Sequence, residues 1–467
     1  MAVYFRHILR HAAAAVAVLA FSFCAFSCLE DKDFIIDDEP EAPASHEGGR
    51  EETPELRRVL IFYEAGFNNL ARYLYDDINK EMVSGWLPGN HRNDNVILVY
   101  SKLSMSMTDG NPSYEDYTPK KSYLTRIYRD DLTDKAVQDT IEVFDESHIA
   151  SSSQTLNEVL SIARDRFPAR GYGLLFSSHG SGWLPQDYYY DPWTFEKKHV
   201  GELTASAVEG MKRVRADIPS SRLEDDPYFG MTRSLGRDEE SSGGVTPAKE
   251  MTTAELVAGI PFHLDYLLFD MCFSASVEVM YALKDKTSWI GASCAEVLAN
   301  GLFDYSHITS FLLNGKEPDL PGLIKDGFAM YDGHSFGLEQ SSTISLIRTD
   351  GMDSLAEVCR YLFEKYSSAL ANLKYKNVQG YYRLDRHYFF DLEDVFVKCG
   401  ASEEDLAMLR EALGGCVTYC AATPWFMESF RIDTTCGLSI YLPAAGTRLL
   451  NKYYMEEAWN KDTGLVR

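Results

Sequence analysis

From residue 57 onward, short continuous apolar runs alternate with stretches that carry apolar residues at helical spacing. A continuous apolar run is typical of a strand that is covered on both faces. Strands of this kind are expected at residues 59–63, 96–100, 172–176, 264–269 and 288–292. Because helical stretches separate these runs, the pattern predicts an α/β fold with a mostly parallel sheet flanked by helices.

The helical stretches are less uniform than the strands. Thr155 and Glu158 are spaced as a capping box, and Pro168 is expected to end the helix that follows them. Further helices are expected at residues 68–82, 253–259, 277–284, 353–372 and 403–413, and further extended segments at 124–128, 140–144, 343–347 and 438–442. The last third of the chain is therefore expected to be a helix-rich α/β region.

The N-terminus has the pattern of an export signal. A basic head that contains Arg6 and Arg10 precedes an uncharged apolar run over residues 12–27. Small Ser27 stands before Cys28, which resembles a bacterial lipobox whose cysteine becomes the lipidated N-terminus of the mature chain. The alternative is a plain signal peptide with an incidental cysteine. The lipobox interpretation predicts attachment to a bacterial membrane, with the outer membrane and the cell surface as the expected location.

The chain divides into four parts by composition. Residues 1–27 are the signal, and residues 28–56 are an acidic tether, rich in Pro and Gly, with no apolar periodicity. Residues 57–350 are expected to form the core of the fold, within which residues 184–250 read as an exposed, flexible insertion. Residues 351–467 form the C-terminal region, with helices and at least one strand.

Composition excludes several classes of protein. The 467 residues are 45% hydrophobic and 25% charged, as in ordinary globular chains, and their net charge is −25. A surface this acidic repels phosphate backbones, so nucleic acid is not an expected partner. No apolar stretch after the N-terminal signal is long enough to cross a bilayer.

Seven cysteines remain once Cys24 and Cys28 of the signal are set aside. Export permits disulfides, but an odd number leaves at least one thiol unpaired. Cys416 and Cys420 have the spacing of one helical face, with no histidines nearby to complete a metal site. Buried small side chains or one disulfide are the expected explanation there, and no metal site is predicted.

Two reactive side chains follow buried strands. His179 lies in a glycine-rich loop after the strand at residues 172–176, and Cys272 follows the strand at residues 264–269. Active sites of open α/β sheets form at the carboxyl ends of the strands, where an imidazole can lower the pKa of a thiol and carry its proton. Gly180 leaves room for a substrate, and its N–H is a candidate donor to an oxyanion. The alternative is a loop histidine and a buried, inert cysteine.

The chain resembles the clostripain-like cysteine peptidases, which are relatives of caspases and gingipains, over nearly all of residues 57–443. The first matching stretch is the asparagine-rich turn that leads to Leu70 and Asp77. The others follow in family order: LLFSSHGSGW at residues 174–183, LLFDMCFSASVEVMYAL at 267–283, Gly291 to Ser293 with Phe303 to Tyr305, and GLSIYLP at 437–443.

The resemblance implies a caspase-like fold and an endopeptidase that acts on proteins or peptides. It makes Cys272 the nucleophile and His179 the general base and acid. Family members prefer to cut after Arg or Lys, and Asp270 matches the acid that lies near the pocket for that side chain. Asp270 could instead be a strand-end cap. Asp304 is a second pocket candidate.

Several positions depart from the family pattern. Ser178 replaces the acid that commonly precedes the histidine, and Cys294 stands beside the expected pocket. Some relatives mature by autocleavage in the region that corresponds to residues 184–250, and basic residues are available here: Lys197, Lys198, Arg213, Arg215 and Arg222. The sequence requires no cofactor, the resemblance leaves calcium binding open, and a monomer is expected.

Two other functions are consistent with the sequence. The chain could be a surface lipoprotein that keeps the fold as an inactive or binding homologue. It could also be a serine hydrolase, because Gly291-Ala292-Ser293-Cys294-Ala295 loosely resembles a nucleophile elbow after a strand, although Ala295 replaces the second glycine.

Overall fold

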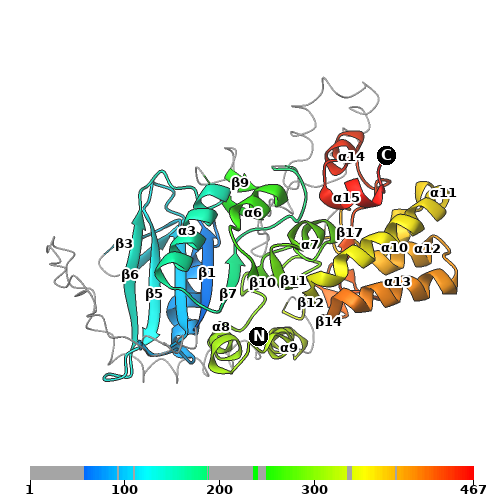
Figure 1. Cartoon of the computed structure of the whole chain (residues 1–467). Helices are drawn as coiled ribbons and strands as arrows, with labels where there is room; N and C mark the ends of the chain where they lie inside the picture. Colours follow the sequence, from blue (N-terminus) through cyan, green and yellow to red (C-terminus); the bar gives the residue numbers. More distant parts are fainter. Residues whose placement is uncertain are drawn as a thin grey trace, which may run out of the picture. The chain divides into compact units, whose positions relative to one another are not determined.

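A nine-stranded sheet is the centre of the fold in the computed structural model, with strand order β14-β12-β11-β10-β7-β1-β2-β5-β6 (Figure 1). The structure describes residues 57–91, 94–108, 111–186, 188, 235–239, 249–333, 339–383 and 387–467. Residues Thr53–Ser106 and Ser113–Arg467 form one compact unit, which contains the whole sheet.

The middle of the sheet is parallel and its two sides are antiparallel. Strands β11, β10, β7, β1 and β2 run parallel to one another. Strands β12 and β14 on one side, and β5 and β6 on the other, pair antiparallel. The strands are β1 (Arg58–Gly66), β2 (Val96–Leu103), β5 (Ser122–Arg129), β6 (Ala136–Phe144), β7 (Gly171–Ser177), β10 (Leu264–Asp270), β11 (Thr287–Ala292), β12 (Thr343–Arg348) and β14 (Val417–Ala422). The predicted α/β class with a mostly parallel sheet flanked by helices is confirmed.

The central strands are apolar without interruption because each face of the sheet has its own core. In β1, Val59, Ile61 and Tyr63 point into one hydrophobic cluster, and Leu60 and Phe62 point into the other. All five side chains are fully buried. The two-residue period of a strand therefore divides one apolar run between two cores.

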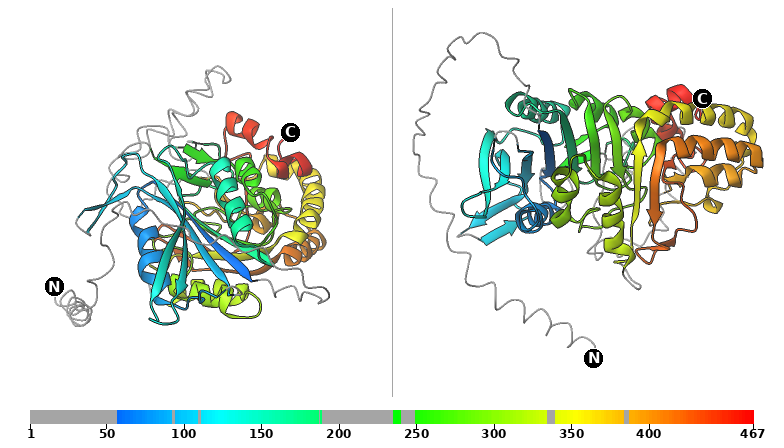
Figure 2. Two further views of the ribbon diagram at one scale, coloured as in Figure 1. Left: turned by 60° about the vertical axis from the view of Figure 1, so that its left-hand side comes forward. Right: turned by 60° about the horizontal axis from the view of Figure 1, so that its bottom comes forward.

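Helices cover both faces, as the two further views in Figure 2 show. Three of those packed into the first core are α3 (Ser153–Arg166), α6 (Thr253–Gly259) and α7 (Val277–Leu283). The second core is closed by α8 (Tyr305–Thr309), π-helical η5 (Ser310–Asn314) and α9 (Leu320–Asp332), with α8 and α9 at the lower edge of Figure 1.

The helix expected over residues 68–82 is irregular. It begins as α2 (Ala71–Asp76), widens into the π-helical segment η1 (Asp77–Glu81) and ends in the 3₁₀ turn η2 (Met82–Ser84). Such widened turns are rare in helices and frequent at functional sites. The apolar spacing predicted a helix here, but it contained no signal for the change of hydrogen-bond pattern.

The predicted capping box at Thr155 is wrong. Ser152 is the N-cap of α3, because its backbone is extended and its Oγ accepts the Thr155 N–H at 3.2 Å. Glu158 instead lies 3.1 Å from His148 Nε2. The helix ends at Arg166, just before Phe167 and Pro168, as expected.

The C-terminal region adds mostly helices and one strand of the main sheet, β14, which pairs with β12 just before the region begins. Its helical elements are η6 (Thr349–Gly351), α10 (Met352–Lys365), α11 (Ser367–Ala371), η7 (Tyr375–Asn377), α12 (Leu392–Lys398), α13 (Glu403–Cys416), α14 (Arg448–Tyr454) and α15 (Ala458–Thr463). Short strand pairs accompany them: β13 (Phe390–Asp391) with β17 (Ser439–Ile440), and β15 (Trp425–Phe426) with β16 (Phe430–Arg431).

The expectation for the cysteines needs one correction. Cys416 and Cys420 do not share a helical face, because α13 ends at Cys416 and Cys420 lies in β14. All seven cysteines from Cys272 onward are free thiols in the structure.

Part of the segment at residues 184–250 differs from the expected exposed insertion. Leu235–Asp238 forms strand β8, which is buried throughout and pairs with β9 (Lys249–Met251). Asp238 accepts the N–H groups of Ala150 and Ser151 and lies 3.2 Å from Lys102 Nζ. The mixed charge of this segment predicted exposure to solvent. In the structure, the Asp238 carboxylate is instead paired with the Lys102 ammonium inside the protein. The basic residues proposed for autocleavage lie outside the described residues.

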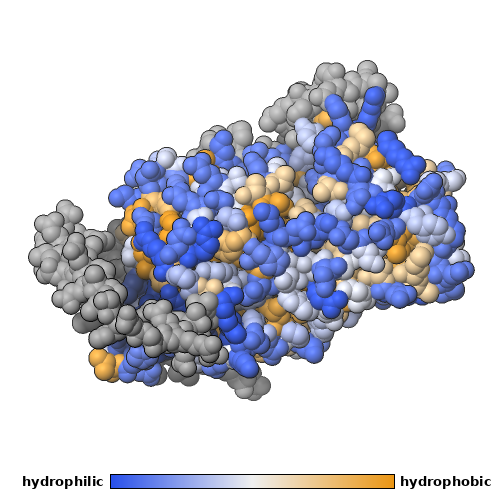
Figure 3. Space-filling view, in the orientation of Figure 1, coloured by the Kyte–Doolittle hydropathy of each residue, from blue (hydrophilic) through white to orange (hydrophobic). Residues whose placement is uncertain are grey.

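The signal at residues 1–27, Cys28 and the tether also lie outside the described residues. Within the described part of the chain, no helix combines the length and the apolarity that a membrane crossing needs. The remaining strands, β3 (Met105–Thr108) and β4 (Asn111–Tyr114), lie outside the main sheet. On the face drawn in Figure 3, hydrophilic side chains predominate and hydrophobic ones occur in scattered groups, as is normal for a solvated surface.

Asp238→Ala tests how firmly β8 is held. The substitution leaves the Lys102 ammonium buried without its partner, so we expect the free energy of unfolding to fall by about 3–5 kcal/mol. Urea unfolding followed by circular dichroism measures this. The control is Glu357→Ala, an exposed position on α10, for which a change within about 0.5 kcal/mol is expected. Equal stability of the two variants would contradict the buried anchoring of β8.

Candidate active site

Two neighbouring parallel strands bring His179 and Cys272 to one edge of the sheet. Strand β7 pairs with β10, and Ser177 is opposite Asp270 at the carboxyl ends of the two strands. His179 and Cys272 each follow two residues later, and both line a cavity of about 380 Å³. We call it the strand-end cavity. Its other polar side chains include Asn69, Asp77, Asp270, Glu296 and Arg383.

The imidazole of His179 is held by a side chain from the end of a third strand. Asn69 lies shortly after β1, and its Oδ1 is 2.6 Å from His179 Nε2. A histidine N–H donates to this amide oxygen, which fixes the orientation of the ring. His179 is 2% exposed, so its position is defined by packing as well as by this hydrogen bond.

The loop that carries His179 is anchored on both sides. Ser178 Oγ donates to the carbonyl of Ala65 at 2.6 Å and accepts the Arg237 N–H at 3.1 Å. The Gly236 N–H donates to the carbonyl of His179 at 3.0 Å. Ser178, the departure from the family pattern, is therefore a structural link between β1, the histidine loop and β8.

Gly180 allows the histidine loop to approach the cysteine turn. A Cβ on Gly180 would lie 2.6 Å from the carbonyl oxygen of Cys272 and 3.0 Å from the side chain of Met271. Any other residue would push the two loops apart. The oxyanion role of the Gly180 N–H remains a prediction.

The thiol of Cys272 lies at the start of a tight turn and is 7% exposed. Its Sγ accepts the Val297 N–H at 3.1 Å. Burial and, to a smaller extent, the nearby Glu296 carboxylate raise the pKa of Cys272, the Val297 N–H lowers it, and the resulting pKa is about 12. The next residue, Phe273, has a φ of 54°, a conformation rarely adopted by bulky residues, and its ring stacks on Phe389 at 4.5 Å.

A buried ion pair forms part of the cavity wall beside the thiol. Arg383 Nε lies 2.8 Å from Glu296 Oε2, and the two side chains are 8% and 10% exposed. Arg383 Nη2 reaches the other carboxylate oxygen at 3.3 Å, so the contact is bidentate. At the thiol, Glu296 raises the pKa of Cys272 more than Arg383 lowers it.

Asp270 lines the cavity and also serves as a cap at the end of its strand. Its Oδ1 accepts the Leu302 N–H at 2.7 Å, and its Oδ2 accepts the Tyr305 hydroxyl at 2.8 Å. Burial raises the pKa of Asp270 to about 6, although both hydrogen bonds favour the carboxylate. The pocket role and the capping role, which the sequence left as alternatives, are thus compatible in one side chain.

Asp304 does not line the strand-end cavity. It is the N-cap of α8, where its Oδ1 accepts the Ser306 N–H at 2.9 Å. The resemblance implied a pocket residue at this position, but Asp is also a favoured N-cap residue, and Asp304 has that role in the structure.

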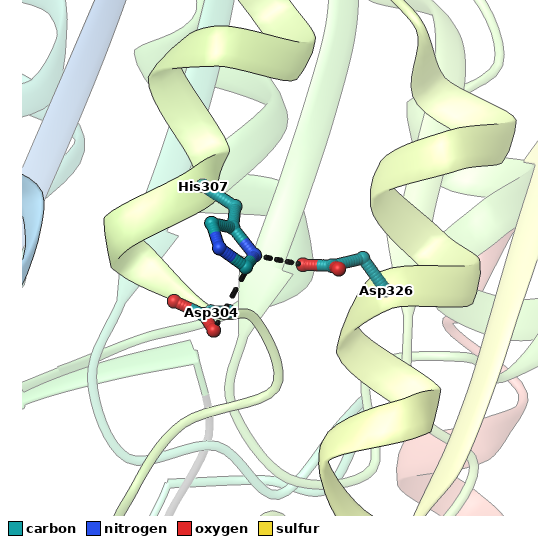
Figure 4. Close-up of side chains that lie close together, drawn as sticks. All are labelled: Asp304, His307 and Asp326. Carbon is teal, nitrogen blue, oxygen red and sulfur yellow. Dashed lines mark hydrogen bonds and ion pairs between the residues drawn. The ribbon is translucent and has the colours of Figure 1, made fainter. Parts of the chain in front are cut away.

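Asp304 also belongs to the one group in the described residues whose side chains are spaced to hold a metal ion, with His307 and Asp326 (Figure 4). His307 Nδ1 lies 3.0 Å from Asp326 and 3.5 Å from Asp304. The contact with Asp326 raises the pKa of His307. A helix cap and a surface ion pair account for the arrangement, and it gives no reason to add a metal.

Ser293, the alternative serine nucleophile, is fully buried. Its Oγ lies 2.7 Å from the Thr343 hydroxyl, and it does not line the strand-end cavity. A nucleophile elbow instead exposes its serine above the sheet. The serine hydrolase alternative is therefore inconsistent with the structure.

Several polar residues of the cavity were absent from the predicted site, among them Asn69, Asp77 and Arg383. Asn69 and Asp77 stand in or beside the first family motif, and that position was the available signal. Arg383 comes from a distant part of the chain, and only the fold brings it to Glu296.

Comparisons with known proteins agree with this geometry. The sequence profile of the clostripain family matches residues 62–201 and 223–454. An inactive zymogen C11 protease from Parabacteroides distasonis is 24% identical, with a TM-score of 0.64 over 88% of this chain and 99% of that one. A secreted C11 cysteine protease from Bacteroides thetaiotaomicron, solved with an irreversible peptide inhibitor, is 20% identical, with a TM-score of 0.63 over 87% and 98%.

At these identities the two structures establish a shared fold and nothing more. A comparison with curated protein sequences found no match. The family profile covers most of the chain and includes both strand ends that carry His179 and Cys272. The chain belongs to the clostripain family and is a cysteine peptidase.

Proposed function

We propose that this chain is an exported, lipid-anchored endopeptidase that uses a His179/Cys272 dyad and cleaves after Arg or Lys. The observation that supports it most strongly is the pairing of β7 with β10, since both reactive side chains then line one cavity. Because the chain belongs to a cysteine peptidase family, we assign peptide-bond hydrolysis to that cavity.

In the proposed mechanism, the dyad must overcome the burial of the thiol. The pKa of Cys272 is raised to about 12, so the free thiol holds its proton at neutral pH. His179 takes this proton as the sulfur attacks the scissile carbonyl, and the resulting imidazolium then protonates the leaving amine. Water hydrolyses the thioester, with His179 acting as the base a second time.

The developing oxyanion needs a donor near the sulfur. Gly180 lies against the Cys272 turn, and its N–H is our candidate for that donor. The basic preference is assigned to Asp270, a buried carboxylate in the same cavity. A charge-assisted hydrogen bond from a cationic side chain would select Arg or Lys over neutral residues.

Export and anchoring rest on the N-terminal sequence. The signal pattern and the Ser27-Cys28 pair support a lipoprotein, and one of the similar structures is of a secreted protease. Autocleavage within residues 184–250, at one of the basic residues named above, would fit the proposed preference for Arg or Lys. Neither the proposed lipid anchoring nor the proposed autocleavage requires a cofactor.

Cys272→Ala tests the nucleophile. Because no other group in the proposed mechanism forms the thioester, we expect cleavage of a fluorogenic peptide with Arg before the cut to fall by at least about 10³-fold. The matched control is Cys399→Ala, a free cysteine outside the cavity, which should keep full activity. Turnover by Cys272→Ala at the wild-type rate would remove Cys272 from the mechanism. A wild-type protein that binds peptides without cutting them would instead favour the inactive homologue.

Asn69→Ala tests the positioning of the imidazole. Loss of the hydrogen bond to Nε2 frees the ring to rotate, so we expect kcat to fall about 10- to 100-fold with little change in KM. Asn69→Asp retains an oxygen acceptor at the same place and should recover most of the rate. If the alanine and aspartate variants were equally impaired, Asn69 would have a packing role alone.

Cys28→Ser tests the anchor. A diacyl-type lipid on Cys28 provides enough buried hydrocarbon for stable membrane attachment, so the wild-type protein should enter the detergent phase in Triton X-114 partitioning. The Cys28→Ser protein should remain in the aqueous phase. The same partitioning for both proteins would leave a plain signal peptide as the explanation.

A further inference from the structure

We propose that Asp77 is a second specificity-determining acid of the strand-end cavity and makes the direct contact with the cationic side chain that precedes the cut. This inference rests on the proposed endopeptidase function and deepens it, because it assigns the substrate contact to a residue on a different element from Asp270.

The position of Asp77 is unusual for a carboxylate. It is 5% exposed, and it lines the same cavity as Asp270 and Cys272. It is also the first residue of η1, the π-helical widening between α2 and η2. The change of helix type therefore occurs at the residue whose side chain reaches the cavity.

The carboxylate of Asp77 makes no hydrogen bond and no ion pair with any other residue in the part of the chain that the structure describes. Buried acids are normally paired or hydrogen-bonded, since an unpartnered buried carboxylate is costly. Its neighbour Asp76 shows the ordinary arrangement, with an ion pair to Lys80 at 2.6 Å on the helix surface. Asp77 thus has its hydrogen-bonding capacity available to a ligand in the cavity.

Asp270 is differently placed. Each of its two oxygens already accepts an internal hydrogen bond, from Leu302 N–H and from the Tyr305 hydroxyl. A guanidinium or ammonium group bound in the cavity would therefore meet two different carboxylates. That of Asp270 is fixed by hydrogen bonds, and that of Asp77 accepts none from the described residues. The two acids thus have different roles. Asp270 contributes negative charge from a rigid position, and Asp77 accepts hydrogen bonds from the N–H groups of the ligand.

The electrostatics of the cavity favour a cationic ligand. Burial, together with repulsion from Asp270 and Glu64, raises the pKa of Asp77 to about 10. A cation between the acids would lower these pKa values again and release a proton. The titratable groups that surround Asp77 are Asp270 of β10, Glu64 of β1, Asp76 and Glu81 of its own helical segment, Tyr305 of α8 and Tyr331 of α9.

The test compares substrates that differ in charge and hardly in shape. Peptides with Arg or with neutral citrulline before the cut are assayed for kcat/KM with the wild-type protein, Asp77→Asn, Asp270→Asn and Asp76→Asn. In the wild type, Arg should exceed citrulline by a wide margin. Asp77→Asn should lower the Arg-to-citrulline ratio about 10- to 100-fold. Asp76→Asn, the adjacent control outside the cavity, should leave the ratio unchanged.

Asp270→Asn keeps the inference testable even if Asp77→Asn fails to fold. Since Asp77 remains, that variant should retain part of the preference for Arg. A ratio that falls to one in Asp270→Asn, or that stays at the wild-type value in a folded Asp77→Asn, would overturn the role of Asp77. A wild-type enzyme with equal rates on the two peptides would instead refute the proposed basic specificity itself, and an inactive wild type would refute the proposed function.

Discussion

The parallel pairing of β7 with β10 is the constraint on which the site depends. Its register places Ser177 opposite Asp270, so the residues that follow both strands emerge side by side at one edge of the sheet. The approach is so close that Gly180 has no space for a Cβ beside the carbonyl of Cys272. A slip of the register would turn the last side chains of β10 to opposite faces and separate the histidine loop from the cysteine turn.

Burial is the second physical constraint on the site, and it raises the pKa of the cysteine and of the acids alike. The pKa of Cys272 is raised to about 12, that of Asp270 to about 6 and that of Asp77 to about 10. All three groups are thus less easily ionised before a substrate enters. Substrate binding and proton movement are coupled in such a cavity. A bound cation stabilises the ionised form of the acids, and His179 receives the proton of the thiol when the sulfur attacks.

Much of this arrangement could be predicted from the sequence, because it depends on local patterns. The buried strands, the loop at His179 and the turn at Cys272 follow from apolar runs that end in polar or glycine-rich stretches. The partners that come from elsewhere in the chain could not be predicted. Arg383 meets Glu296 only through the fold, and β8 is a buried strand because Lys102 and loop N–H groups neutralise Asp238. Asp304 caps α8, a common role for aspartate, whereas the resemblance to the family implied a pocket role.

The anchoring of β8 bears on how the proposed enzyme would tolerate a cut in its own chain. Gly236 and Arg237 donate to the histidine loop, so β8 supports the site directly. On the other side of the segment, Leu184 is buried in the same core as Leu235. Both ends of the segment thus make contacts of their own with the rest of the protein. In the proposed autocleavage, these are the contacts that would continue to support His179 after a cut between them.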